Sequence, residues 1–213
     1  NALPGISIQR HETPIRFAAL VQTLQQIRDS RMSGSPKKQI FLPQLSLVIG
    51  GARSGKSRFA EGLVTGTLRP RVYIATAQAW DDEMCARISA HQSDRGADWH
   101  TLEAPHDLCG ALAQIPAGHV VLLDCATLWL TNRMLAEADL ETESAAMIAA
   151  LQSCAAPVVV VTNELGWSIV PENALARRFR DAQGRLNQRL AASAGLVVTV
   201  IAGLPLVLKG TLP

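Results

Sequence analysis

A short segment near residue 50 carries the residue types that bind a nucleoside triphosphate. Residues 50–57 read Gly-Gly-Ala-Arg-Ser-Gly-Lys-Ser and match the whole pattern G-x-x-x-x-G-K-[ST]. Glycines let such a loop turn tightly and point its N–H groups inward, where they and the start of the following helix attract phosphate. We expect Lys56 to reach the β- and γ-phosphates as a catalytic group and Ser57 to ligate Mg²⁺. The alternative, a glycine-rich turn with an exposed lysine, is disfavoured by the complete match. The predicted nucleotide-binding residues are Gly50, Gly51, Ala52, Arg53, Ser54, Gly55, Lys56 and Ser57.

Two carboxylates follow apolar runs further along the chain. Asp124 comes directly after four apolar residues and is predicted to hold Mg²⁺; its alternative role is to cap a helix that starts at Ala126. Glu164 follows another apolar run and Thr162-Asn163. Because ligands of open α/β sheets bind at the carboxyl edge, Glu164 is expected near the reaction zone, beside the metal or as a proton acceptor. Its alternative is an exposed loop carboxylate.

His91 stands in a basic setting. Met84, Ile88 and His91 fall on one stripe of a helix predicted from Asp82 to Ser93, so a half-buried histidine is the simpler interpretation of the spacing. Arg87 and Arg95 lie four positions on either side, where they would keep the imidazole neutral and could grip a phosphate. Spacing alone leaves both interpretations open.

The long helix predicted from Glu172 to Ala192 separates an apolar stripe from a basic one. We expect the core side to contain Leu175, Phe179, Ala182, Leu186 and Leu190. The remaining surface carries Arg177, Arg178, Arg180, Asp181, Arg185, Asn187, Gln188 and Arg189. Five arginines on one helix usually form a solvated face, and contact with an anion is the alternative.

Alternating apolar runs and helical patterns predict an α/β fold with a mainly parallel sheet. Strands are expected at 45–49, 72–75, 119–123, 157–162 and 196–202, with an edge strand at 205–208. Helices are expected at 56–64, 82–93, 106–114 and 172–192, with a pair between 127 and 154. A polar linker at 33–38 divides the chain into an appendage, residues 1–44, and a catalytic domain, residues 45–213.

Composition excludes several classes of protein. The 213 residues carry a net charge of only +2, which argues against a nucleic-acid or anionic-membrane binder. The apolar run at 195–208 is too short and too interrupted to span a bilayer. The four cysteines lack C-x-x-C spacing and are expected to be reduced core residues. We expect a cytoplasmic protein without a secretory leader.

Six motifs, in order, resemble one known family. They occupy residues 50–57, 73–77, 81–91, 161–164, 169–173 and 179–188. Between Leu45 and Leu208 the chain closely resembles the bifunctional adenosylcobinamide kinase/adenosylcobinamide-phosphate guanylyltransferases of cobalamin biosynthesis. Two departures stand out: residues 1–44 have no place in the family pattern, and some relatives have glutamate where this chain has Asp124.

The resemblance implies a RecA-like P-loop fold of three layers, usually in a homotrimer, with two reactions on one protein. The first phosphorylates the aminopropanol hydroxyl of adenosylcobinamide with GTP, or alternatively ATP, and Mg²⁺. The second transfers GMP from GTP onto that phosphate through a guanylylated histidine, which here is His91. Arg87, Arg95 and Glu103 are the further nucleotide-binding candidates. Candidates for substrate contact or for support of the site are Glu164, Glu172, Arg180, Asp181, Asn187 and Gln188.

Two other functions remain to be compared with this one. The chain could be a P-loop kinase of another small alcohol in which His91 is merely structural. It could also be a nucleotide-gated binding module without catalysis. Guanine preference comes only from the resemblance, since the N-K-x-D motif of GTPases is absent from the sequence.

Overall fold

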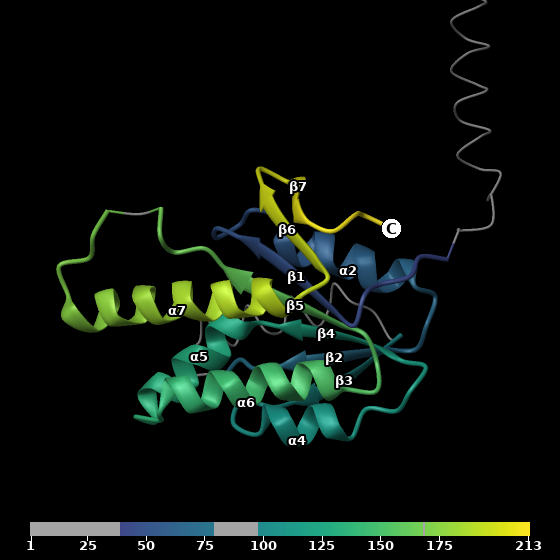
Figure 1. Ribbon diagram of the computed structural model, residues 1–213, viewed down its shortest axis with the longest axis horizontal. Helices are drawn as coiled ribbons and strands as arrows, with labels where there is room; N and C mark the ends of the chain where they lie inside the picture. Colours follow the sequence, from purple (N-terminus) through teal and green to yellow (C-terminus); the bar gives the residue numbers. More distant parts are fainter. Residues whose placement is uncertain (1–38, 79–97, 168) are drawn as a thin grey trace, which may run out of the picture. The chain divides into compact units, whose positions relative to one another are not determined.

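A seven-stranded sheet organises the part of the chain that the structure describes, which in this computed structural model is residues 39–78, 98–167 and 169–213. Its order is β3-β2-β4-β5-β1-β6-β7 (Figure 1). The strands are β1 (Leu45–Gly50), β2 (Arg71–Ala75), β3 (Trp99–Glu103), β4 (Val120–Asp124), β5 (Val158–Asn163), β6 (Leu196–Ile201) and β7 (Leu204–Lys209). Neighbours pair in parallel except β6 and β7, which are antiparallel. The predicted α/β fold with a mainly parallel sheet is therefore confirmed.

Helices cover both faces of the sheet, because its central strands are apolar on both sides. The helices are α2 (Lys56–Gly66), α4 (Leu108–Ala113), α5 (Ala126–Leu135), α6 (Leu140–Ser153) and α7 (Ala174–Ser193). One core joins α2 to side chains such as Val48 and Val161, and the other joins α4, α5, α6 and α7 to side chains such as Leu47 and Val160. Figure 1 shows the resulting three layers, with α2 on one side of the sheet and α4, α6 and α7 on the other.

Strand β3 was not predicted. Its residues are half-buried or exposed, and its sequence lacks the apolar run that marks the central strands. Pairing with β2 holds it, together with an edge-on contact between the rings of Trp99 and Tyr73, whose centroids lie 6.3 Å apart. The guanidinium of Arg71 also lies 5.5 Å from the Trp99 ring centroid. The sequence of such a polar edge strand carries no strand signal, so it is recognised only by its pairing with β2.

Three expectations about burial were wrong. Leu175 is 52% exposed because it lies near the start of α7, on the part that extends past the sheet. Asn187, expected on the polar surface of the helix, is buried, and so is Gln183. Cys109 is exposed, whereas Cys125 and Cys154 are buried free thiols.

Several sequence predictions fall outside the described residues. These are the helix from Asp82 to Ser93, with Arg87, His91 and Arg95, and nearly all of the predicted appendage. Gln39 to Pro213 forms one compact unit. Within the described ranges, no helix combines the length and the apolar character needed to cross a membrane.

Candidate nucleotide-binding site

The loop between β1 and α2 has the strand, loop and helix order that the phosphate-binding motif requires. Gly50 ends β1, and Gly55 precedes α2 with a left-handed φ of 91°. A Cβ at Gly50 would lie 2.4 Å from the Ser54 Oγ and 2.7 Å from the Val200 carbonyl oxygen. Only glycine fits this turn without displacing the loop or β6.

The turn between β6 and β7 supports the same loop. The N–H of Gly203 donates a hydrogen bond to the carbonyl of Ser54, at 2.8 Å. A Cβ at Gly55 would approach the Cα of Gly203 to 3.2 Å, so these two glycine backbones pack against each other. Gly203 was not predicted as part of the site, and the only local signal for it is a glycine between two apolar runs. Its contribution depends on β6 lying beside β1.

Lys56 and Ser57 form the first turn of α2. The ammonium of Lys56 donates to the carbonyl of Gly51 at 3.2 Å, so its side chain folds back over the loop. The first turn of α2 contains no acidic residue, and its N–H groups therefore keep their attraction for anions. The hydroxyl of Ser54 is buried without a hydrogen-bond partner among the described residues, which leaves an unused donor within the loop.

Asp124 ends β4 at the same edge of the sheet as the loop. Strand β5 separates β4 from β1, so these two strands lie about 10 Å apart across the sheet, with Asp124 level with Val161 and Gly50 level with Asn163. Helix α5 begins at Ala126 with Cys125 as its N-cap residue, so Asp124 precedes the cap position. The Tyr73 hydroxyl donates to Oδ2 of Asp124 at 3.3 Å. Asp124 therefore lies at the sheet edge that carries the loop, and a hydrogen bond from Tyr73 of β2 holds its carboxylate.

Thr76 fixes the residue after Asp124. Its hydroxyl donates to the Cys125 carbonyl at 2.7 Å and accepts from the Cys125 N–H at 3.0 Å. Asn132 in turn donates to the carbonyl of Thr76 at 2.8 Å. These buried bonds restrict the backbone that carries the Asp124 carboxylate.

The pKa of the buried Cys125 thiol responds to the charges of both Asp124 and Lys56. Burial raises the pKa of the Cys125 thiol to about 12, and the negative charge of Asp124 adds to this shift. The positive charge of Lys56 lowers the same pKa. The charges of Lys56 and Asp124 thus act on the pKa of the same buried thiol, in opposite directions.

The donors at this edge fit Mg²⁺ better than a softer metal. Ser57 and Asp124 supply hydroxyl and carboxylate oxygens, and Mg²⁺ takes few protein ligands alongside phosphate oxygens and water. No group of three or more His, Cys, Asp or Glu side chains in the described ranges is arranged to hold a metal. The residues present fit a magnesium ion whose other ligands would be phosphate oxygens of a nucleotide and water.

A buried polar network holds the end of β5. Asn187 donates to the carbonyl of Asn163 at 3.0 Å, and its Oδ1 accepts from Thr162 at 2.8 Å and from Gln183 at 2.9 Å. The N–H of Asn163 donates to the Thr127 hydroxyl at 2.9 Å. The side-chain amide of Asn187 therefore makes hydrogen bonds to Thr162, Asn163 and Gln183 inside the protein. The burial of Gln183 was not predicted from the sequence, because a glutamine on a helix is ordinarily expected to be exposed to solvent.

Glu164 adjoins the phosphate-binding loop through its backbone. Its N–H donates to the Gly50 carbonyl at 3.1 Å, while Oε1 accepts from the N–H of Gly166 at 2.6 Å. The carboxylate is half-buried and turned toward its own loop. The structure thus places the backbone of Glu164 beside the phosphate-binding loop, while its carboxylate bonds to Gly166; its role in the reaction stays a prediction.

Other candidate residues lie farther away. Glu103 ends β3, four strand spacings from β1, which corresponds to about 19 Å. Glu172 is exposed just before α7, and Gln188 is exposed on its surface. Arg180 Nε lies 3.9 Å from Oδ1 of the adjacent Asp181. Among the described residues, none of these five makes a hydrogen bond or an ion pair with Lys56.

Comparison with known proteins gives the relatives of the chain. Residues 46–208 match the family model described as cobinamide kinase / cobinamide phosphate guanyltransferase. The bifunctional adenosylcobalamin biosynthesis proteins CobU of Salmonella typhimurium and Escherichia coli are each 45% identical over 179 residues, covering 76% of this chain and 98% of theirs. The corresponding protein CobP of Pseudomonas aeruginosa is 44% identical over 167 residues, covering 77% and 96%.

Solved structures with a similar trace are more remote in sequence. The RadB recombinase is 16% identical, with a TM-score of 0.45 and coverage of 75% of each chain. A protein from Pyrococcus horikoshii OT3 is 9% identical, with a TM-score of 0.47 and coverage of 82% of this chain and 90% of that one. The family match spans the phosphate-binding loop, Asp124 and the motif that contains His91. The chain therefore belongs to the cobinamide kinase / cobinamide phosphate guanyltransferase family, as its motifs predict.

Proposed function

We propose that this chain is a bifunctional enzyme of cobalamin biosynthesis. It phosphorylates adenosylcobinamide on the aminopropanol hydroxyl and then transfers GMP from GTP to the new phosphate. The observation that carries this proposal is a phosphate-binding loop that shares a sheet edge with Asp124, in a chain that matches the family from residue 46 to 208. The match favours this function over a kinase of another alcohol and over a binding module.

In the kinase step, the loop binds and orients the phosphates. Backbone N–H groups of residues 51–57 surround the β- and γ-phosphates, and Lys56 exchanges the Gly51 carbonyl for a phosphate oxygen. Ser57 and Asp124 would hold Mg²⁺, which would neutralise charge on the phosphates when bound. Tyr73 and Thr76 hold Asp124 and the residue after it in place, so the carboxylate is oriented before the nucleotide arrives.

In the guanylyl-transfer step, His91 is the nucleophile. A neutral imidazole nitrogen attacks the α-phosphorus of GTP, and the bond to pyrophosphate breaks. An oxygen of the substrate phosphate then attacks the same phosphorus, and the histidine leaves. Arg87 and Arg95 disfavour protonation of the imidazole and contact the phosphates. These three roles rest on the motif, because the residues lie outside the described part of the chain.

The proposal also covers the nucleotides and metal that the enzyme uses, its compartment, its oligomeric state and its domains. The nucleotide is GTP in the second step and GTP or ATP in the first, with Mg²⁺ in both. The enzyme acts in the cytoplasm as a homotrimer, without a nucleic-acid partner. Residues 45–213 carry both activities, and residues 1–44 are an appendage. Glu103, Glu172, Arg180, Asp181 and Gln188 stay candidates for nucleotide or corrinoid contact.

A labelling experiment tests the transfer step. The protein is incubated with GTP labelled in the α-phosphate and Mg²⁺, and the adduct is located by mass spectrometry. We expect an acid-labile GMP group on His91 and no such group in His91→Ala. Label retained by His91→Ala, or absent from the wild type, would contradict the guanylyl-transfer mechanism.

A turnover assay separates the three functions. With adenosylcobinamide, GTP and Mg²⁺, the wild type should form phosphorylated and then GDP-linked cobinamide. Lys56→Ala should form far less of the phosphorylated product, whereas Arg58→Ala, an exposed neighbour in α2, should retain the activity. Nucleotide binding without any cobinamide product would favour a binding module, and phosphorylation of another alcohol only would favour the other kinase.

A further inference from the structure

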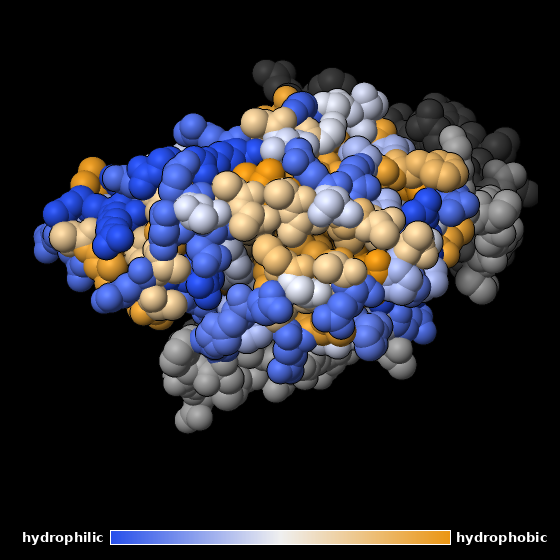
Figure 2. All heavy atoms as spheres, turned by 60° about the horizontal axis from the view of Figure 1, so that its bottom comes forward, coloured by the Kyte–Doolittle hydropathy of each residue, from blue (hydrophilic) through white to orange (hydrophobic). Residues whose placement is uncertain are grey.

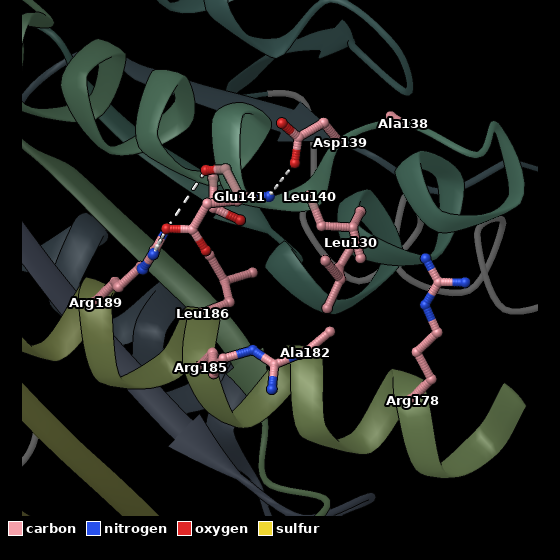
Figure 3. A pocket seen from close by; sticks show the side chains of 11 residues that line it. Leu130, Ala138, Asp139, Leu140, Glu141, Arg178, Ala182, Arg185, Leu186 and Arg189 are labelled. Atoms are coloured by element: carbon pink, nitrogen blue, oxygen red, sulfur yellow. Dashed lines mark hydrogen bonds and ion pairs between the residues drawn. The ribbon is translucent and has the colours of Figure 1, made fainter. Parts of the chain in front are cut away.

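A cavity of about 250 Å³ lies between α5, α6 and α7 (Figure 3). It is formed by Leu130 of α5, the turn and first residues of α6 at 138–144, and one face of α7. Its lining includes three arginines of α7, namely Arg178, Arg185 and Arg189. None of its lining residues belongs to the phosphate-binding loop or to the region around Asp124. Figure 2 shows hydrophilic residues, with apolar ones among them, at the left of the view, where Figure 1 places the start of α7.

The arginines of α7 fall into two groups when their partners are compared. Arg189 pairs with the carboxylate of Glu141, and Arg177 donates to the carbonyls of Pro171 and Glu172. Arg180 lies beside Asp181. Arg178 and Arg185 have no ion pair with the described residues, and both line the cavity. Arg178 and Arg185 are therefore the two α7 arginines with neither a hydrogen bond nor an ion pair to the described residues, and both line one cavity.

The cavity also contains two carboxylates, and both are engaged. Asp139 caps α6: its Oδ1 accepts from the Glu141 N–H at 3.1 Å, and its Oδ2 accepts from the Thr142 hydroxyl at 2.6 Å. Glu141 pairs with Arg189, as Figure 3 shows. Neither carboxylate neutralises Arg178 or Arg185, so the cavity keeps an attraction for anions.

The spacing of the two arginines suits a group larger than a single carboxylate. Positions 178 and 185 are two turns apart on one face of α7, about 10 Å along the helix axis. Two long side chains can converge from these positions on a phosphate or diphosphate placed between them. The planar guanidinium fork matches phosphate oxygens in pairs, and both arginines are exposed, so an anion can reach them from solvent.

We propose that this cavity is a second anion site, in which Arg178 and Arg185 bind a phosphate or diphosphate group. The site is separate from the phosphate-binding loop and does not depend on the role of His91. Two molecules in the proposed reactions carry such a group: the nucleotide, including the pyrophosphate that it releases, and the phosphorylated corrinoid. Both present the same chemistry to the arginines, so the experiment uses each in turn.

Site-resolved arginine labelling tests the proposal on the full chain. Phenylglyoxal modifies accessible guanidinium groups, and peptide mass spectrometry gives the rate at each arginine. We expect pyrophosphate to slow labelling of Arg178 and Arg185 several-fold relative to sodium chloride of equal ionic strength. Arg58, which is exposed on α2, should react at the same rate in both solutions. Equal rates at Arg178 and Arg185 in pyrophosphate and in chloride would overturn the proposal.

Further arms identify the source of the anion. Protection by adenosylcobinamide phosphate at lower concentration than by GTP or pyrophosphate would assign the site to the corrinoid, and the reverse order would assign it to the nucleotide. Arg185→Gln should raise the pyrophosphate concentration that half-protects Arg178 by about 10-fold, since one charged contact is lost. Arg58→Gln is the matched control and should leave that concentration unchanged. Unaltered protection of Arg178 in Arg185→Gln would contradict joint binding by the two arginines.

Discussion

The N–H of Gly203 donates a hydrogen bond to the carbonyl of Ser54, which ties the β6–β7 turn to the phosphate-binding loop at 2.8 Å. Gly55 packs on the same turn, since a Cβ there would lie 3.2 Å from the Gly203 Cα. The loop is thus braced from β6 as well as by β1 and α2, which hold its two ends. This bracing preserves the shape of the anion cradle in the absence of a ligand.

Gly55→Ala should therefore weaken both folding and nucleotide binding. Alanine at a φ of 91° costs about 1–2 kcal/mol, and its methyl group would press on Gly203. We expect a lower free energy of unfolding in urea and weaker nucleotide binding by calorimetry. Gly62→Ala is the control: it lies in the same helix with open space around it and should stabilise the protein by about 0.5–1 kcal/mol. Wild-type nucleotide affinity in Gly55→Ala would refute the bracing role.

Tyr73→Phe should raise the Mg²⁺ requirement of the kinase step. The variant removes the hydroxyl that donates to Asp124 but keeps the ring beside Trp99. A net loss of about 0.5–1.5 kcal/mol corresponds to a 2- to 10-fold higher Mg²⁺ concentration for half-maximal rate. The rate at saturating Mg²⁺ should stay close to wild type. Trp99→Phe, which changes the ring contacts with Tyr73 and Arg71 but keeps the Tyr73 hydroxyl, should not move the Mg²⁺ dependence, and an equal shift in both variants would argue for a purely structural effect.

Asn187→Leu should destabilise the end of β5. The change removes the donor to the Asn163 carbonyl and the acceptor for the Thr162 hydroxyl, which still accepts from Gln183, at a cost of about 1–3 kcal/mol for each group left unsatisfied. We expect a clear fall in the free energy of unfolding, measured by urea denaturation. Gln188→Leu, the exposed neighbour, should change it by no more than about 0.5 kcal/mol. Similar stability of the two variants would show that the network contributes little.

The raised pKa of Cys125 predicts a loss of stability at alkaline pH. The folded thiol has a pKa of about 12 against an ordinary value of 9.0, so the unfolded chain releases this proton first. This thiol has no effect on pH dependence below pH 9, and it should destabilise the fold by about 1.4 kcal/mol for each unit from there toward pH 12. Cys125→Ala should show a shallower decline than the wild type in urea denaturation at pH 9 to 11. Parallel declines would contradict a protonated buried thiol.

Sequence patterns predicted some elements well because their signals are local. The glycine spacing, the apolar run before it and the helix after it all lie within residues 45–64, and each contributes its own constraint. Strand β3 was missed for the opposite reason: its residues carry no periodic pattern, and only the pairing with β2 makes it a strand. Leu175 was expected in the core because it shares a stripe with Leu186, but the sheet does not reach its end of α7.

By itself, the sequence determined the fold class, the phosphate-binding loop, the order of the motifs and hence the family. These follow from residue types at short range, where backbone geometry leaves few choices. Only the tertiary structure decided that Gly203 supports the loop, that Tyr73 orients Asp124, and that Asn187 is a buried strut of β5. It also decided which arginines of α7 have no hydrogen bond or ion pair with the described residues. Such contacts join residues far apart in the chain, and they exist only once parallel pairing has brought the strand ends to one edge.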